Sequence, residues 1–93
     1  MIVRIEIHRE GADYEYRVLA DGDVLFGDGG FSSVVGCLAG AVEGLPPAVR
    51  AVEVACGGIV SGTYPLQALL GHADQVAQHA VNTTAAVYEA TRD

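Results

Sequence analysis

Cys56 stands directly before two glycines at the end of a predicted strand, where a thiolate could act as a nucleophile. Such a cysteine needs a neighbouring base and hydrogen-bond donors for an oxyanion. His72 and His79 are candidate bases, but no spacing in the sequence requires either to lie beside the thiol. A small buried cysteine is the other interpretation. A small-molecule enzyme that uses Cys56 and the glycine loop of residues 57–63 is therefore kept as an alternative function.

The run GGIVSGT, from Gly57 to Thr63, has the glycine spacing of a phosphate-binding loop. A Walker-type loop also needs a lysine between its second glycine and its threonine, because that ammonium reaches the β- and γ-phosphates. Here Gly62 is followed directly by Thr63, and the chain contains no lysine. We interpret the loop as a structural connection from a strand to a helix, in which the glycines permit positive φ angles.

The histidines and aspartates do not form a metal-binding pattern. His72 and His79 are seven residues apart, whereas helical metal ligands are usually four apart. Asp21 and Asp23 begin like a calcium-binding loop, but apolar residues fill the next positions, where oxygen ligands are needed. We interpret these aspartates as turn residues and expect neither a metal nor another cofactor.

Charge and composition restrict the possible partners. The 93 residues form one expected domain, residues 1–93, with 51% hydrophobic residues and a net charge of −7. Nucleic acids and anionic membranes need a cationic patch, so neither is an expected partner. No apolar run approaches the roughly 20 residues of a membrane-spanning helix, and the N-terminus alternates like a strand instead of resembling a signal peptide. We expect a cytoplasmic protein in which Cys37 and Cys56 are free thiols.

Alternating apolar and polar residues predict an antiparallel three-stranded meander over residues 2–9, 13–20 and 23–27. Gly11-Ala12 and Asp21-Gly22 are the predicted turns, and Asp-Gly favours a type I′ turn. These turns set a register in which Glu6 lies opposite Arg17, so that unlike charges face each other across the strands. The face expected to pack in the core carries Val3, Ile5, Ile7, Tyr14, Tyr16, Val18 and Leu25.

The remaining residues predict two helical regions separated by one strand. Helical spacing of apolar residues runs from Phe31 to Leu45, where Pro46-Pro47 ends the helix. Residues 49–56 predict a fourth strand, and a short helix from Pro65 to about Gly71 precedes a longer helix over residues 73–91. The expected fold is α+β, in the order β-β-β-α-β-α, with a four-stranded, mainly antiparallel sheet and two helices on one face.

A row of small residues marks the first predicted helix, where Ser32, Gly36, Gly40 and Gly44 recur every four positions. Each internal glycine costs about 1 kcal/mol relative to alanine, so the row needs a packing reason. Close contact with the alanines of the second helix is one reason, and a helix-to-helix dimer is the other.

The outer face of the predicted sheet carries apolar side chains among charged ones. The register places there Ile2, Arg17, Leu19, Val24 and Phe26. Leu19 is expected opposite Val24, and Arg17 opposite Phe26. An apolar cluster with a charged rim is typical of a contact surface, although scattered exposed hydrophobic residues are also common. We interpret these five residues as partner-binding.

The stretch from Met1 to about Ala55 resembles the partial ribonuclease-H-like domain of HicB-type antitoxins. The matching features are Gly27-Asp28 before the helix and the apolar spacing from Phe31 to Leu45. The resemblance implies a small non-enzymatic domain that oligomerises and contacts a protein. The chain departs from that family where Asp21-Gly22 replaces a proline-rich loop, and where a helix without basic residues replaces the DNA-binding tail. The expected function is a non-catalytic protein-binding or self-assembly module that uses the outer sheet face.

Overall fold

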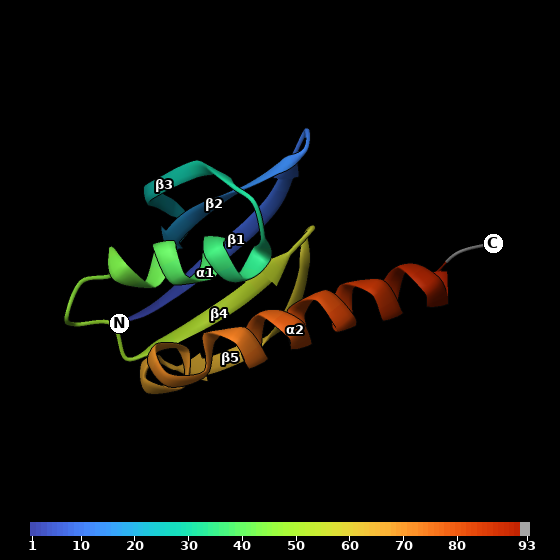
Figure 1. Cartoon of the computed structure of the whole chain (residues 1–93). Coiled ribbons are helices and arrows are strands. Elements are labelled where there is room, and N and C mark those ends of the chain that lie inside the picture. The colour runs from blue at the N-terminus through green and yellow to red at the C-terminus, as the bar shows by residue number, and fades with distance from the viewer. Residues whose placement is uncertain (92–93) are drawn as a thin grey trace.

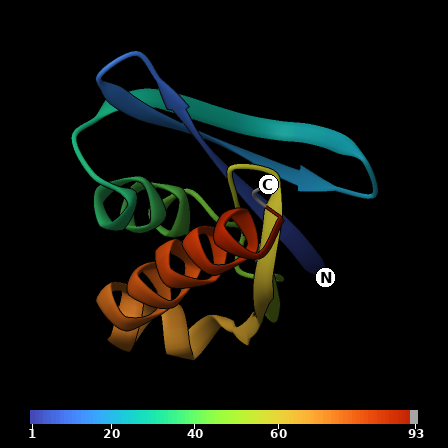
Figure 2. The same cartoon turned by 90° about the vertical axis from the view of Figure 1, so that its right-hand side faces the viewer.

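The computed structural model describes residues 1–91 as one five-stranded sheet and two helices (Figure 1). The elements in chain order are β1 (Ile2–Glu10), β2 (Asp13–Ala20), β3 (Asp23–Phe31), α1 (Val34–Glu43), β4 (Ala51–Cys56), β5 (Ile59–Pro65) and α2 (Leu66–Thr91). The strand order in the sheet is β3-β2-β1-β4-β5. β1 and β4 are parallel, and the other three neighbouring pairs are antiparallel. Both helices lie on the same side of the sheet (Figure 2).

The α+β fold and the placement of the helices agree with the prediction, but the number of strands was wrong. Residues 59–65 form the edge strand β5 instead of a loop leading to a helix. Gly57 and Gly58, with φ angles of 60° and 82°, make a two-residue turn between β4 and β5. Both central positions of a type I′ turn need positive φ, which glycine adopts without strain. The glycine run is therefore the turn of a β-hairpin and part of its second strand, and the order is β-β-β-α-β-β-α.

The predicted pairing of the first two strands is confirmed. Glu6 lies opposite Arg17 and His8 opposite Glu15 in the β1–β2 ladder. The turn into β3 has φ angles of 52° at Asp21 and 83° at Gly22, as expected for a type I′ turn. The turn positions and the pairing of unlike charges thus predicted the β1–β2 register correctly.

The β2–β3 register shifts after its first two pairs, and this shift corrects the predicted position of Phe26. Leu19 lies opposite Val24 as predicted, but Phe26 pairs with Val18 and Gly27 pairs with Arg17. An extra residue in one strand of a ladder reverses the faces of the residues that follow it. Phe26 therefore lies on the helix side, where its ring meets the ring of Tyr16 edge-on at 6.1 Å between centroids. Leu25, which was expected in the core, is the extra residue and is 43% exposed.

Helix α1 begins later and ends earlier than its apolar spacing predicted. Ser33 caps its N-terminus, where the hydroxyl accepts a hydrogen bond from the Gly36 backbone N–H at 3.0 Å. Phe31, predicted in the helix, is instead the last residue of β3, and its ring packs beside Tyr16 at 5.6 Å. At the C-terminus, the Gly44 N–H donates a hydrogen bond to the Ala41 carbonyl oxygen, and the Leu45 N–H donates one to that of Val42.

Gly40 in α1 and Gly44 at its C-cap make room for aromatic rings from β3. A Cβ at Gly40 would lie 2.9 Å from Cζ of Phe31, and one at Gly44 would lie 2.8 Å from Cε2 of Phe26. Real Cβ atoms essentially never approach other atoms so closely. The row of small residues therefore has an intramolecular packing reason, but its partners are two phenylalanines and not the alanines of α2.

Helix α2 continues from the end of β5 and contains one break. His72 has φ −138° and ψ 39°, which separates a short first segment from a longer second one. This break lies where the sequence predicted two successive helices. The side chains of α2 that are buried against the sheet and α1 are Leu69, Val76, Ala77 and Ala80. Among the described residues, no helix is both long and apolar enough to cross a membrane.

Candidate interaction surface on the open sheet face

The two faces of the sheet differ because only one is covered by helices (Figure 2). Side chains alternate along β1, so Val3, Ile5 and Ile7 are buried under the helices while Ile2 is 65% exposed. We call the face that bears Ile2, Arg4 and Glu6 the open face. Residues on it are free to contact other molecules, since neither helix of the described chain covers it.

Arg4 links two neighbouring strands across the open face. Its Nε donates a hydrogen bond to Oε1 of Glu53, which lies directly opposite on β4. Its Nη1 lies 3.5 Å from Oε2 of Glu6, and Oε1 of Glu6 lies 3.8 Å from Nε2 of His8. The hydrogen bond and charge of Glu53 raise the pKa of Arg4, with a smaller contribution from Glu6. The guanidinium thus has carboxylate partners on two strands, Glu6 on β1 and Glu53 on β4.

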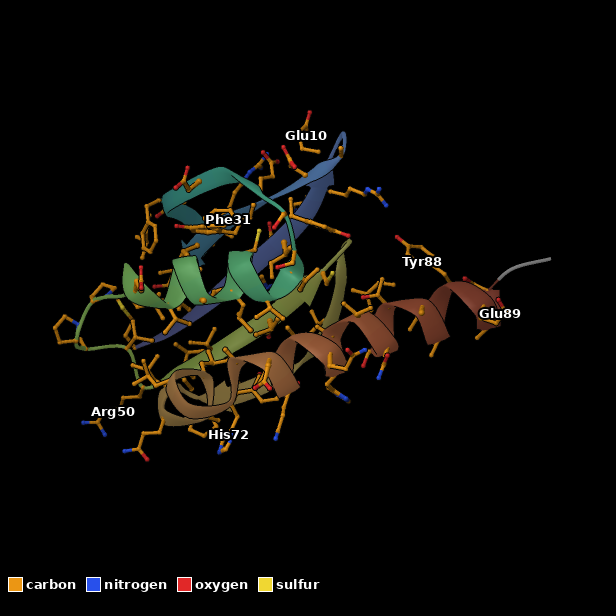
Figure 3. The ribbon with its side chains drawn as sticks, viewed as in Figure 1. Glu10, Phe31, Arg50, His72, Tyr88 and Glu89 are labelled. Carbon is orange, nitrogen blue, oxygen red and sulfur yellow. The ribbon has the colours of Figure 1, made fainter. Side chains whose placement is uncertain are left out.

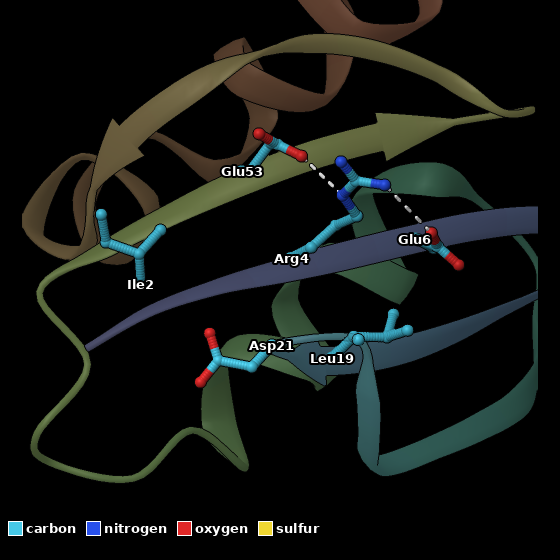
Figure 4. Close-up of a pocket in the computed structure, with 7 residues that line it drawn as sticks. Ile2, Arg4, Glu6, Leu19, Asp21 and Glu53 are labelled. Carbon is cyan, nitrogen blue, oxygen red and sulfur yellow. Dashed lines mark hydrogen bonds and ion pairs between the residues drawn. The ribbon is translucent and has the colours of Figure 1, made fainter.

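A shallow cavity of about 370 Å³ opens beside Arg4 (Figure 4). Its lining residues are Ile2, Arg4, Glu6, Leu19, Asp21, Gly22 and Glu53. Ile2 and Leu19 contribute apolar surface to the cavity, and Arg4, Glu6, Asp21 and Glu53 contribute charged groups. The cavity therefore combines a small apolar surface with ordered polar groups, which is the composition of many binding sites.

Four of the five residues predicted as partner-binding lie on the open face. Ile2 and Leu19 line the cavity, and Val24, which is 57% exposed, lies opposite Leu19. Arg17 lies between the buried Tyr16 and Val18 and is exposed on the same face. The prediction for Phe26 was wrong, because the bulge turns its ring toward α1.

The ion pair between Arg4 and Glu53 is the part of this surface that the sequence did not reveal. Glu53 lies in a predicted strand, but which strand would pair with it was unknown. The parallel pairing of β1 with β4 brings together residues that are 49 positions apart. The alternation of Glu53 with buried Val52 and Val54 was the available indication that its side chain faces away from the core.

The thiols of Cys37 and Cys56 lie on the helix side, away from the open face. Burial raises the pKa of Cys37 to about 11, and nearby charges add to this shift. Burial also raises the pKa of Cys56, although the Thr84 side chain opposes the shift. Both thiols therefore remain protonated near neutral pH, and a protonated thiol is a poor nucleophile.

Hydrogen bonds to backbone carbonyl groups connect the neighbourhood of Cys56 to α2 and β1. The Thr84 hydroxyl donates a hydrogen bond to the Cys56 carbonyl oxygen at 3.1 Å, and the Gly57 N–H donates one to the Ile7 carbonyl oxygen at 2.9 Å.

Within residues 1–91, no three His, Cys, Asp or Glu side chains gather as metal ligands would. The His79 ring lies beside Thr83, 3.5 Å away.

Comparison with known proteins gives no relative for this chain. No protein-family model, no curated protein and no solved structure matches it. The resemblance to HicB-type antitoxins therefore stays a prediction from the sequence.

Proposed function

We propose that this chain is a small non-catalytic module that docks a protein partner on the open face of its sheet. The surface consists of the apolar side chains of Ile2, Leu19 and Val24 together with the charged groups of Arg4 and Arg17. Protein interfaces combine apolar with polar side chains, and arginine is enriched in them. Phe26 is not part of the proposed surface.

The observation that carries the proposal is the ion-paired arginine beside apolar side chains at the cavity. Arg4 contacts Glu53 and Glu6, and Ile2 and Leu19 line the same cavity. A side chain that already has partners before binding loses less conformational entropy when another protein arrives. Arginine is also enriched where binding energy is concentrated at interfaces.

The alternative function, an enzyme that uses Cys56, has less support from the geometry. The glycines of residues 57–63 form a turn and a strand, and the pKa of the thiol is raised where a nucleophile needs it lowered. Alkylation by iodoacetamide at pH 7, followed residue by residue with mass spectrometry, tests it. A Cys56 that reacts faster than free cysteine would favour the enzyme.

Comparative capture from the native cells tests the docking surface. Wild-type protein and the double variant Leu19→Ser/Val24→Ser are immobilised, and Val35→Ser serves as a control because Val35 is an exposed valine on α1. We expect a partner that binds the wild type and the control and binds the double variant at least about tenfold more weakly. A partner that binds all three equally well would contradict the proposal.

A further inference from the structure

Charged residues are unevenly distributed between the two halves of the chain. Residues 1–53 contain nine acidic residues and four arginines, but only Asp74 and Glu89 are charged between residues 54 and 91. The second segment comprises the last three residues of β4, all of β5 and all of α2. One side of an otherwise acidic molecule is thus nearly free of charge.

Helix α2 extends past the end of the sheet, and its far end has little beneath it (Figures 1 and 3). Among the described residues of α2, none after Ala80 is buried. Val87 lies seven positions after Ala80, on the same helical face, yet it is 37% exposed. The apolar stripe that packs against the body therefore continues beyond it.

The far end of α2 has a sequence that does not favour an isolated helix. Residues 81–91, VNTTAAVYEAT, include five β-branched residues. β-Branched residues lower helix propensity, and isolated helices of this length are marginal in water. Two hydrogen bonds join the segment to the β4–β5 hairpin, from Thr84 to Cys56 and from Tyr88 to the Gly57 carbonyl oxygen at 3.2 Å. Packing against another surface would stabilise it.

The strand β5 beside this helix is an edge without charged residues. It pairs only with β4 and carries no Asp, Glu, Lys or Arg, and its Val60 is 45% exposed. The other edge, β3, contains Asp23 and Asp28 and has two register shifts. Charges and bulges protect edge strands from pairing with other chains. β3 has both, whereas β5 has one register shift and no charge.

We propose that a second copy of this chain covers the weakly charged corner formed by β5 and the far end of α2. Two copies that each carry a charge of −7 repel one another, so they can approach most easily where acidic residues are fewest. A twofold axis would place β5 beside β5 of the other copy, where free backbone groups can pair, and would pack the exposed α2 stripes together.

This dimer does not depend on the docking surface of the open face. Ile2 pairs with Ala51, and Ala51 pairs with Pro65, at one end of the strands. Val60 pairs with Ala55 at the other end, next to the Gly57-Gly58 turn that Tyr88 contacts. The two surfaces can therefore be changed separately.

Sedimentation equilibrium of the full chain and three lysine variants tests the dimer. Val60→Lys changes β5, Val87→Lys changes α2, and Leu25→Lys is the control on the opposite edge strand, where Leu25 is 43% exposed. We expect a wild-type dimer whose dissociation constant rises at least about tenfold in Val60→Lys, in Val87→Lys or in both, and stays unchanged in Leu25→Lys. Circular dichroism checks that each variant folds.

Three results would overturn the proposal. The first is a wild-type protein that is monomeric at about 100 µM, and the second is a dimer affinity that is unchanged in both valine variants. The third is a loss of dimer affinity in Leu25→Lys as large as in the valine variants. Hydrogen exchange gives an independent measurement on the unmodified protein. We expect the backbone amides of β5, but not those of β3, to gain protection as the protein concentration rises. Failure of the dimer would leave capture on the open face unaffected, and loss of that capture would leave the dimer unaffected.

Discussion

The two faces of the sheet use the same strands for different purposes. On the covered face, Ile5 and Val18 are completely buried, and glycines of α1 fit against the rings of Phe26 and Phe31. On the open face, Ile2 and Val24 remain exposed, and ionic groups lie in the centre of the sheet. The stability of this fold therefore depends mainly on the covered face. Packing constrains the residues of the open face less, so their composition can vary with a binding role.

Replacing one isoleucine by alanine on each face of β1 should give the largest difference in the free energy of unfolding. Ile5→Ala removes a fully buried side chain and should lower the free energy of unfolding by about 2–5 kcal/mol. Ile2→Ala, on the same strand but on the open face, should change it by less than about 0.5 kcal/mol. Urea unfolding of both variants measures the two values. Similar losses in the two variants would show that the open face also contributes to the core.

Filling the space beside a glycine of α1 should have the next largest effect. Gly40→Leu places side-chain atoms where the Phe31 ring lies, so we expect a loss of about 1–3 kcal/mol despite the better helix propensity of leucine. Gly71→Ala is the control, because a Cβ there meets nothing within 4 Å. Thermal unfolding should show a lower Tm for Gly40→Leu only. An unchanged Tm in Gly40→Leu would mean that the ring moves aside at little cost.

High pH should weaken the covered face through Cys37. The pKa of this thiol is about 11 in the folded protein, against 9.0 for an ordinary thiol. Because the pKa of the thiol is raised in the folded protein, its contribution to the free energy of unfolding is complete below about pH 9. This contribution is lost as the pH rises toward about 11. The stability advantage of the wild type over Cys37→Ala should therefore shrink across this range in urea titrations. A constant difference from pH 8 to pH 11 would contradict burial of the thiol.

The smallest effect on stability should come from the ion pair of the open face. Arg4→Gln and Glu53→Gln remove an exposed pair that water and salt screen, so each should reduce stability only slightly. A double-mutant cycle between the two positions isolates their coupling, which should decrease as salt is added. A large coupling that does not change with salt would mean that the pair is structural.

Local signals in the sequence predicted the meander, whereas the later part of the sheet depended on contacts between distant residues. Asp21-Gly22 fixed the start of β3 because its turn type requires positive φ. The bulge that turns Phe26 inward has no comparable local signature, and the space left by Gly44 for its ring appears only after α1 folds back. Gly57-Gly58 is a hairpin signal, but the glycine spacing of residues 57–63 fits a strand-to-helix connection equally well.

The sequence predicted only those residues of the candidate site whose positions depend on local signals. Ile2, Leu19 and Val24 follow from alternation and from the turns of the meander. The ordering of Arg4 by Glu53 follows from the parallel pairing of β1 with β4, which requires a crossover through α1. No spacing within the sequence encodes that neighbour.

Photo-crosslinking in the native cells tests the central claim, docking on the open face, most directly. A benzophenone amino acid is placed at Val24 on the open face and, in a second protein, at Val35 on α1, since both side chains are exposed. Docking on the open face predicts a discrete crosslinked protein from position 24 and none from position 35. No crosslink from position 24, or the same product from both positions, would contradict it.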